Sequence, residues 1–285
     1  MTIHDDLPNN GAIDWYYREP SAVFGDVRSD TLDPVLQVNH PRGAAISGYF
    51  DAVGFDPVAG TFSHPERWDS DFQAVETFNG EDFRSQEDGT VLDWFAFLDM
   101  GMRIAAMGNS DSHDIPWSEM GFPRSCLLIG HDSTADVTSL EIRDAVKAMK
   151  VTVSGGILVT AIGPGSEGPG EIVDAPSGTA DVQVMVQAPT WMSADRLRVF
   201  VSGEEVETIT LDASTADPTN PAIRFDAAIA VSTDGADGWV VFEAEGDTAM
   251  PYATPGRRPF GMTNPIYLDA DGDGAITPRR PLPGP

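Results

Sequence analysis

The sequence feature that most constrains the fold of the N-terminal half is a short apolar run that ends in a polar loop. Residues 103–107 have the length and composition of a buried strand, and Asn109, Asp111 and His113 follow in a loop of Gly and Ser. Loops at the carboxyl ends of parallel strands carry the chemistry in such sheets. A carboxylate and an imidazole two residues apart can turn toward one divalent cation. The alternative interpretation is an Asx-turn with a solvent-facing histidine.

Two earlier runs have the same design. Residues 35–38 form a compact apolar run that ends in Asn39-His40-Pro41, and the proline cannot continue a central strand. Residues 72–78 form another run, which ends in Asn79-Gly80. If these strands are parallel neighbours, one edge of the sheet collects their polar residues. The side chains expected there are His40, Glu76, Asn79, Asp111 and His113.

Strands and helices alternate in the first half of the chain. Residues 90–100 are predicted to form a helix, with Gly101 placed to end it, between the strands 72–78 and 103–107. A second helix is predicted from a capping box at Thr138–Glu141, with Leu140, Ala145, Val146 and Met149 on its apolar face, and it leads into a strand at 151–153. This alternation indicates an α/β layer or a partial barrel.

The composition changes at residues 163–170, which are mostly Gly and Pro. Short alternating apolar runs follow, separated by turns such as Ser202-Gly203, and they predict a small antiparallel β-sandwich. The predicted organisation is a metal-site domain at 1–160, a linker at 161–170 and a β-rich domain at 171–285.

Residues 44–71 form a long stretch without periodicity. Such a connection is usually an active-site lid or a disordered insert. It contains His64, which we expect to be a solvent-facing turn residue, although a lid histidine that reaches the site is the alternative.

The net charge of −28 argues against nucleic acid or an anionic membrane as a partner, because both require basic patches. No apolar run approaches the roughly 20 residues of a membrane span. The segment 1–6 has neither the cationic region nor the apolar region of a signal peptide. We expect a soluble bacterial protein, and a secreted or periplasmic location stays open if an N-terminal segment has been lost.

An acidic loop near the C-terminus resembles a calcium loop. Asp269, Asp271 and Asp273 occupy its positions 1, 3 and 5, and Gly274 occupies position 6, where the chain turns sharply. Position 12 is Arg280 in place of the usual bidentate Glu. The alternative is a solvated acidic turn after a strand.

Several stretches resemble, in order, the polymerase-and-histidinol-phosphatase (PHP) superfamily of metallohydrolases, and within it the CehA/McbA group. They are Val-Asn-His-Pro-Arg-Gly at 38–43, Ala-Val-Glu-Thr-Phe-Asn-Gly at 74–80 and Gly-Asn-Ser-Asp-Ser-His at 108–113. The similarity continues through 93–98, 121–124, 154–156 and 263–267, and so covers most of the chain.

The resemblance implies the C-terminal part of a distorted α/β barrel, followed by the β-rich domain. It also implies a cluster of divalent ions, zinc, manganese or iron, held by His40, Asp111 and His113. Arg42 would steady an anionic substrate, and Arg124 would be a more distant substrate contact. Supporting roles next to the ligands would fall to Glu76, Asn79 and Asn109. The substrate would be a small phosphoester, or a carbamate or carboxylic ester.

The sequence departs from the family at its start. PHP enzymes open with a His-x-His motif and further early ligands, but this chain has no His-x-His. We therefore expect a chain that lacks the N-terminal part of the PHP domain, with weak or no activity unless another polypeptide supplies ligands. The alternative function is a non-catalytic, calcium-stabilised binding or surface module. A serine hydrolase built on Ser110 or Ser154 is disfavoured, because no Gly-x-Ser-x-Gly motif is present.

Overall fold

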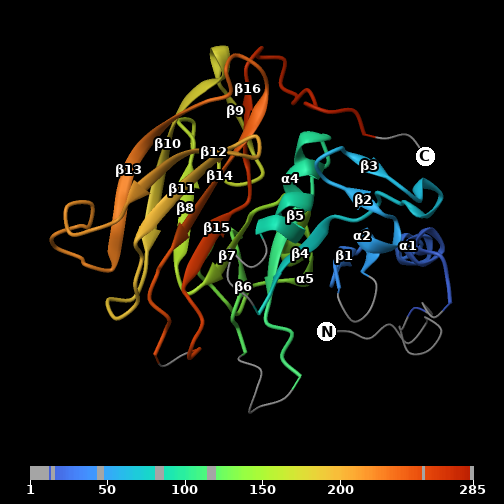
Figure 1. Cartoon of the computed structure of the whole chain (residues 1–285), viewed down its shortest axis with the longest axis horizontal. Helices are drawn as coiled ribbons and strands as arrows, with labels where there is room; N and C mark the ends of the chain where they lie inside the picture. The colour runs from blue at the N-terminus through green and yellow to red at the C-terminus, as the bar shows by residue number, and fades with distance from the viewer. Residues whose placement is uncertain are drawn as a thin grey trace.

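The computed structural model describes residues 13, 17–43, 48–80, 87–113, 120–251 and 254–282. The fold is mixed α/β, with few helices and a majority of strands in several sheets (Figure 1). The α-helices in the described ranges are α1 (Pro20–Arg28), α2 (Tyr49–Ala52), α4 (Leu92–Asp99) and α5 (Ser139–Lys147). Shorter turns of other helix types are η2 (Pro65–Arg67), η3 (Glu87–Val91) and η4 (Pro176–Gly178). None of these helices is long and apolar enough to span a membrane.

A parallel sheet in the N-terminal half carries the predicted site. Its order is β1 (Gln37–Val38), β4 (Ala74–Asn79) and β5 (Ala105–Asn109). The predicted unit of strand, helix and strand is present, with η3 and α4 between β4 and β5. Helix α4 is buried on nearly every side, and Trp94 donates its indole N–H to the carbonyl of Ile104 at 2.8 Å. The parallel register brings the carboxyl ends of the three strands to one edge.

The larger sheet combines strands from both halves of the sequence. Its order is β12 (Glu204–Thr210), β11 (Arg196–Val201), β14 (Gly238–Glu245), β15 (Phe260–Thr263), β7 (Val151–Gly155) and β6 (Arg124–Leu127), with β16 (Ile266–Asp269) joining β14 to β9 (Ile172–Asp174). A further sheet has the order β13 (Ile223–Ser232), β10 (Thr179–Gln187) and β8 (Leu158–Ile162). The pairs in both sheets are antiparallel, except β9 with β16. The second half is therefore antiparallel β, as the alternating runs predict.

Side chains take the place of a neighbouring strand along the free edge of β5. Asn264 accepts a hydrogen bond from the backbone N–H of Ala106 at 2.8 Å and donates to the carbonyls of Ala106 and Val151, both at 3.0 Å. Further along, the Ser125 hydroxyl accepts from the N–H of Gly108 at 3.0 Å and donates to its carbonyl at 3.2 Å. Because Asn264 is fully buried, these bonds join the parallel sheet to the larger one.

Strand pairing crosses the predicted linker. β7 precedes residues 163–170 but pairs with β15, and one continuous hydrophobic core includes residues from both sides. The Gly/Pro stretch itself is anchored: Gly163 N–H donates to the carbonyl of Glu167 and Gly170 N–H to that of Pro265, both at 2.7 Å. Glycine is required at 170, because a Cβ there would lie 1.8 Å from the carbonyl oxygen of Ala148. The stretch is a fixed loop of the fold.

Part of the segment 44–71 is folded and rich in aromatic side chains. Residues 48–71 contain α2, η2 and a hairpin of β2 (Phe55–Asp56) and β3 (Thr61–Phe62). Their rings stack on α4, where Phe97 lies 4.5 Å from Phe55 and 5.4 Å from Trp68 between ring centroids. The disordered insert is thus wrong for these residues, because scattered aromatic side chains bury area without a periodic pattern, and the lid stays a prediction. His64 is half exposed and lies 3.6 Å from Glu66, as expected for a turn residue.

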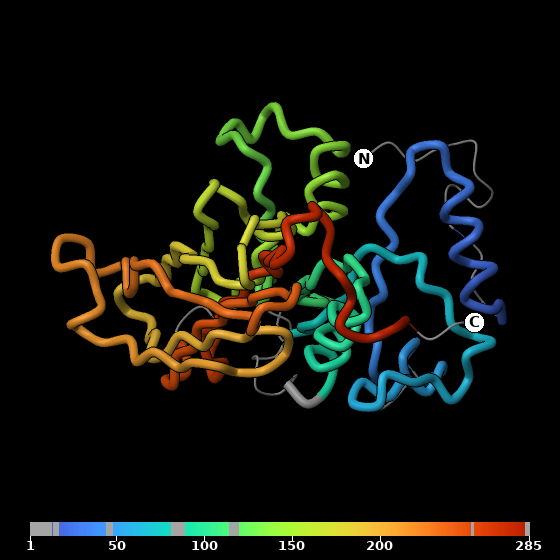
Figure 2. The backbone as a smooth tube through the Cα atoms, turned by 90° about the horizontal axis from the view of Figure 1, so that it is seen from above, coloured from blue at the N-terminus to red at the C-terminus, as the bar shows by residue number. Residues whose placement is uncertain are grey.

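The C-terminal segment returns to the N-terminal half. After β16 the chain runs alongside α4 toward the β2–β3 hairpin, and Figure 2 shows this red segment crossing to the cyan part of the backbone. Arg280 fixes it there by donating its side chain to the carbonyl of Pro57 at 2.8 Å and its backbone N–H to the carbonyl of Asp99 at 3.0 Å. No closed barrel forms among the described residues, so the PHP-type barrel remains a hypothesis.

Candidate metal site at the edge of the parallel sheet

The edge of the parallel sheet brings the predicted polar residues together. Glu76 lies within β4 and is 3% exposed, so its carboxylate is a buried centre for this edge. One oxygen, Oε2, accepts hydrogen bonds from the backbone N–H of His40 at 2.9 Å and from Nδ2 of Asn79 at 3.1 Å. The other, Oε1, accepts from Nδ2 of Asn109 at 2.9 Å. Glu76 therefore connects the ends of all three strands.

Asp111 lies between two histidines. Its Oδ2 is 3.5 Å from Nε2 of His40, and its Oδ1 is 2.9 Å from Nε2 of His113. The other ring nitrogen of His40, Nδ1, is 3.2 Å from Nδ2 of Asn79, so the ring is held from behind while Nε2 faces Asp111. The side chains of His40 and His113 are 58% and 76% exposed, so both are open to solvent and to ligands.

The backbone at both His40 and Asp111 is in the left-handed region, with φ of 46° at each residue. This conformation is uncommon for residues other than glycine and concentrates at functional sites. Here it turns each side chain back toward the other after its strand has ended. Two of the three predicted metal ligands thus have this conformation, which seven other non-glycine residues of the described ranges share.

The distances from Asp111 to the two histidines can be compared with those between ligands of one metal ion. Zinc ligands lie about 2.0–2.2 Å from the ion, so two ligands of a tetrahedral ion are separated by roughly 3.2–3.6 Å. The His40–Asp111 separation of 3.5 Å has this size. The His113–Asp111 separation of 2.9 Å is shorter and is that of a direct contact, made to the other oxygen of the carboxylate. The side chains of His40, Asp111 and His113 do not form a group whose ligand atoms all lie within 4.8 Å of one another. In the described ranges, the group that meets this criterion is Asp237, Asp269 and Asp271.

Arg42 is held by other residues of the chain. Its guanidinium donates to both oxygens of Asp93 at 2.6 and 2.8 Å, to Asp51 at 3.1 Å and to the carbonyl of Phe55 at 2.8 Å. Burial raises the pKa of Asp93, and the bonds from Arg42 oppose that rise. The pKa of Arg42 is raised, chiefly by the hydrogen bonds to Asp93. This geometry gives Arg42 a structural role, and the substrate contact stays a prediction.

Arg124 lies on the face of β6 that points away from β5 and from the candidate metal site. Neighbouring residues of a strand point to opposite faces, and Ser125 points to Gly108 of β5. Arg124 therefore lies on the other face of β6, together with its cross-strand partner Ser154. The structure does not bring Arg124 together with His40, Asp111 or His113.

The predicted calcium loop has one partner that the sequence does not indicate. Ligand oxygens of Asp237, Asp269 and Asp271 all lie within 4.8 Å of one another. Asp237 precedes β14, 32 positions before the loop, and its Oδ1 and Oδ2 accept the N–H groups of Ala270 and Thr277, each at 2.8 Å. Burial opposes ionisation of Asp237, but these N–H groups outweigh it and lower its pKa. Only a turn signal, Asp237-Gly238, marks this residue in the sequence.

The remaining loop residues do not follow the EF-hand arrangement. Asp273 is outside the cluster and accepts the N–H of Ala275 at 2.8 Å. Arg280, at position 12, faces α4, where its Nε lies 3.6 Å from Oδ2 of Asp99. Asp269 already accepts the N–H groups of Gly272 and Gly274, each at 2.7 Å.

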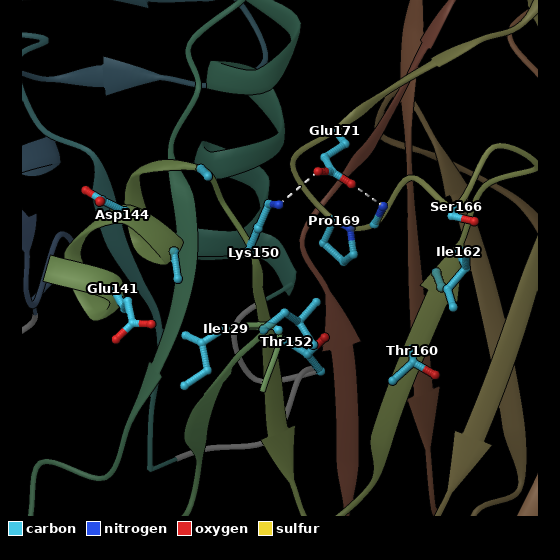
Figure 3. Close-up of a pocket in the computed structure, with 16 residues that line it drawn as sticks. Ile129, Glu141, Asp144, Lys150, Thr152, Thr160, Ile162, Ser166, Pro169 and Glu171 are labelled. Carbon is cyan, nitrogen blue, oxygen red and sulfur yellow. Dashed lines mark hydrogen bonds and ion pairs between the residues drawn. The ribbon is translucent and has the colours of Figure 1, made fainter. Parts of the chain in front are cut away.

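A pocket beside α5 contains none of the predicted site residues. It has a volume of about 690 Å³ and lies between α5, β8 and the loop that ends at Glu171 (Figure 3). At one end Lys150 pairs with Glu171 at 2.9 Å, and Glu171 also accepts the N–H of Gly168 at 2.7 Å. These bonds lower the pKa of Glu171, the Gly168 bond most strongly. The charges of this pocket are thus paired within the protein.

Comparisons with known proteins do not identify a family. No protein-family model matches the sequence, and no curated protein matches it. The arrangement of the residues is therefore the basis for assigning a function.

Proposed function

We propose that this chain is a metal-dependent hydrolase of the PHP type, acting on small phosphoesters or on carbamate or carboxylic esters. The observation that carries the proposal is Asp111, whose two oxygens face His40 and His113 at the carboxyl edge of the parallel sheet. Imidazole nitrogens and a carboxylate suit zinc, manganese or iron. The resemblance of the three sequence stretches to PHP enzymes supports the same function.

The neighbouring residues have roles that suit such a site. A bound divalent ion lowers the pKa of a water and polarises a phosphoryl or carbonyl oxygen. Asn79 positions the His40 ring, and Glu76 holds the backbone of His40 and the side chain of Asn109. Second-layer contacts of this kind fix the orientation of metal ligands.

Among the residues that the structure describes, the ligand set is partial. Each oxygen of Asp111 has one histidine beside it, and a catalytic zinc site has three protein ligands. We therefore propose that further ligands come from another polypeptide, and that the chain alone turns over substrate slowly.

Hydrolysis of 4-nitrophenyl phosphate and 1-naphthyl N-methylcarbamate by the purified chain tests this proposal. With added manganese or zinc we expect slow turnover that a chelator abolishes and that His113→Ala reduces at least about tenfold. His64→Ala is the matched control and leaves the rate unchanged, because His64 pairs only with Glu66 in the turn. Turnover that is indifferent to chelation and to His113→Ala would contradict the metal mechanism.

A second candidate is a calcium-stabilised binding module, favoured by the cluster of Asp237, Asp269 and Asp271. Calcium prefers oxygen ligands of this kind. On this proposal the ion fastens the C-terminal loop to the start of β14 and stabilises the fold without chemistry.

Calcium at about ten times its dissociation constant should stabilise the chain by about 1.4 kcal/mol and raise its Tm by roughly 2 °C. Asp271→Asn should abolish that increase, because Asp271 belongs to the cluster. Asp273→Asn has the same charge change in the same loop and should retain it. Thermal scans of the three proteins with calcium and with chelator measure the effect. An increase that survives Asp271→Asn but not Asp273→Asn would contradict the cluster as the ion site.

A further inference from the structure

A small pocket lies at the opposite end of β6 and β7 from the pocket beside α5. It has a volume of about 270 Å³, close to the lower limit of roughly 300 Å³ for ligand pockets. Arg124 and Ser154 come from the paired strands, and the other side is lined by Pro189, Trp191, Met192, Met250 and Thr254. Because these residues face away from β5, the pocket is separate from the His40–Asp111 site.

The apolar wall of this pocket is preformed. Met192 and Met250 are 6% and 2% exposed and pack over Gly156, where a Cβ would lie 2.7 Å from the sulfur of Met192. Arg224 fixes the loop by donating to the carbonyls of Pro189 and Met192 at 2.8 and 2.9 Å. Trp191, in the same loop, is 47% exposed and also lines the pocket. Methionine and tryptophan side chains suit a flat apolar or aromatic group.

The polar groups of the pocket are donors. Ser154 is 6% exposed, and its oxygen accepts the N–H of Gly156 at 3.2 Å, so its hydroxyl hydrogen remains to be donated. Arg124 supplies a guanidinium on the adjacent strand. No acidic residue lines the pocket in the described part of the chain, although the protein has 45 acidic residues and 17 basic ones. The pocket is thus a local exception to the overall charge.

Arg124 also differs from most other basic residues in its lack of a hydrogen-bond or ion-pair partner among the described residues. Most basic side chains of this protein have a carboxylate or carbonyl partner, as Lys147 has Asp33 and Arg103 has Gly170. Neither guanidinium of Arg124 and Arg257 has a hydrogen bond or ion pair with any residue that the structure describes. Of these two arginines Arg124 lines the pocket, whereas Arg257 only accepts the N–H of the lining residue Met250 with its backbone carbonyl, at 2.8 Å. Guanidinium groups bind carboxylates and phosphates with paired hydrogen bonds.

We propose that this pocket binds a small organic anion, a carboxylate or phosphonate oxyanion that carries an apolar or aromatic group. The oxyanion accepts hydrogen bonds from Arg124 and Ser154, and the apolar group lies against Trp191, Met192 and Met250. The site does not depend on the metal site or on the proposed hydrolytic activity.

Isothermal titration of the full chain with phenylphosphonate and with phenylacetate tests the site, and benzyl alcohol is the neutral probe. We expect saturable binding of one anion per chain and none of benzyl alcohol. Arg124→Gln should weaken binding by about tenfold to a hundredfold, the usual effect of losing a charge-assisted hydrogen bond. Ser154→Ala and Trp191→Ala should each weaken it less. His113→Ala should bind the anions as the unchanged protein does.

Arg67→Gln is the matched control, because it removes the same charge from an exposed turn far from the pocket. It should bind both probes normally. Methylphosphonate should bind more weakly than phenylphosphonate, since it lacks the aromatic group. A preference between phenylphosphonate and phenylacetate assigns the natural oxyanion. The proposal is overturned if neither anion binds, or if Arg124→Gln binds as tightly as Arg67→Gln while circular dichroism shows both folded.

Discussion

Replacing Arg42 with Ala should lower the free energy of unfolding by about 3–5 kcal/mol, the usual cost of leaving a buried charge without its partner. The Asp93 side chain is 1% exposed and receives two hydrogen bonds from Arg42. Arg42 also holds Asp51 and the β2–β3 hairpin through the carbonyl of Phe55. Chemical denaturation of the variant and the unchanged protein measures this loss.

The loss should depend on pH. Burial raises the pKa of Asp93 in the folded protein, and removing Arg42 allows it to rise further. A carboxyl whose pKa is raised by folding contributes stability at low pH, and that contribution is lost as the pH rises through the folded pKa. Arg42→Ala should therefore cost less at pH 5 than at pH 8. Arg67→Ala, which breaks an exposed pair, should cost less than about 1 kcal/mol at either pH. An equal and small cost for both variants would show that Asp93 is not held by Arg42.

Replacing Asn264 with Leu should lower the free energy of unfolding by about 3 kcal/mol or more. The buried amide satisfies the N–H and carbonyl of Ala106 and contributes to the carbonyl of Val151. Leucine has the same branched shape and number of side-chain heavy atoms but no polar atoms, so backbone groups would stay buried without partners, at roughly 1–3 kcal/mol each.

The same denaturation experiment measures this effect. Asn220→Leu is the matched control: Asn220 is exposed and accepts a single weak bond from Ala222 at 3.3 Å, so the expected change is within about 0.5 kcal/mol. If Asn264→Leu were as mild as Asn220→Leu, the side-chain bridge between β5 and β7 would not hold the two sheets together.

Local sequence patterns were sufficient to predict many individual helices and strands. Helix α4 lies within the expected residues 90–100, and the predicted capping box forms, with Thr138 accepting the N–H of Glu141 at 3.2 Å. The strand ends that place His40, Asp111 and His113 on one edge are also local signals. They follow from where apolar runs stop.

Other features depend on contacts that a local pattern does not contain. The strand at 151–155 is present, but it pairs antiparallel with β15 because Asn264 and Ser125 occupy the edge of β5. Leu140, expected on the apolar face of its helix, is 50% exposed. Asp237 joins the acidic loop only through the pairing of β14 with β16. The role of Arg42 depends on the burial of Asp93, 51 positions away.

The metal content of the purified chain is the most direct test of the proposed site. Mass spectrometry after dialysis against trace zinc, manganese and calcium would compare the unchanged protein with Asp111→Ala, His113→Ala and His64→Ala. We predict about one or more transition-metal ions per chain, lost with Asp111 or His113 and retained with His64→Ala. Retention of calcium alone, indifferent to Asp111 and His113, would contradict the metallohydrolase site and leave the calcium-stabilised module as the function.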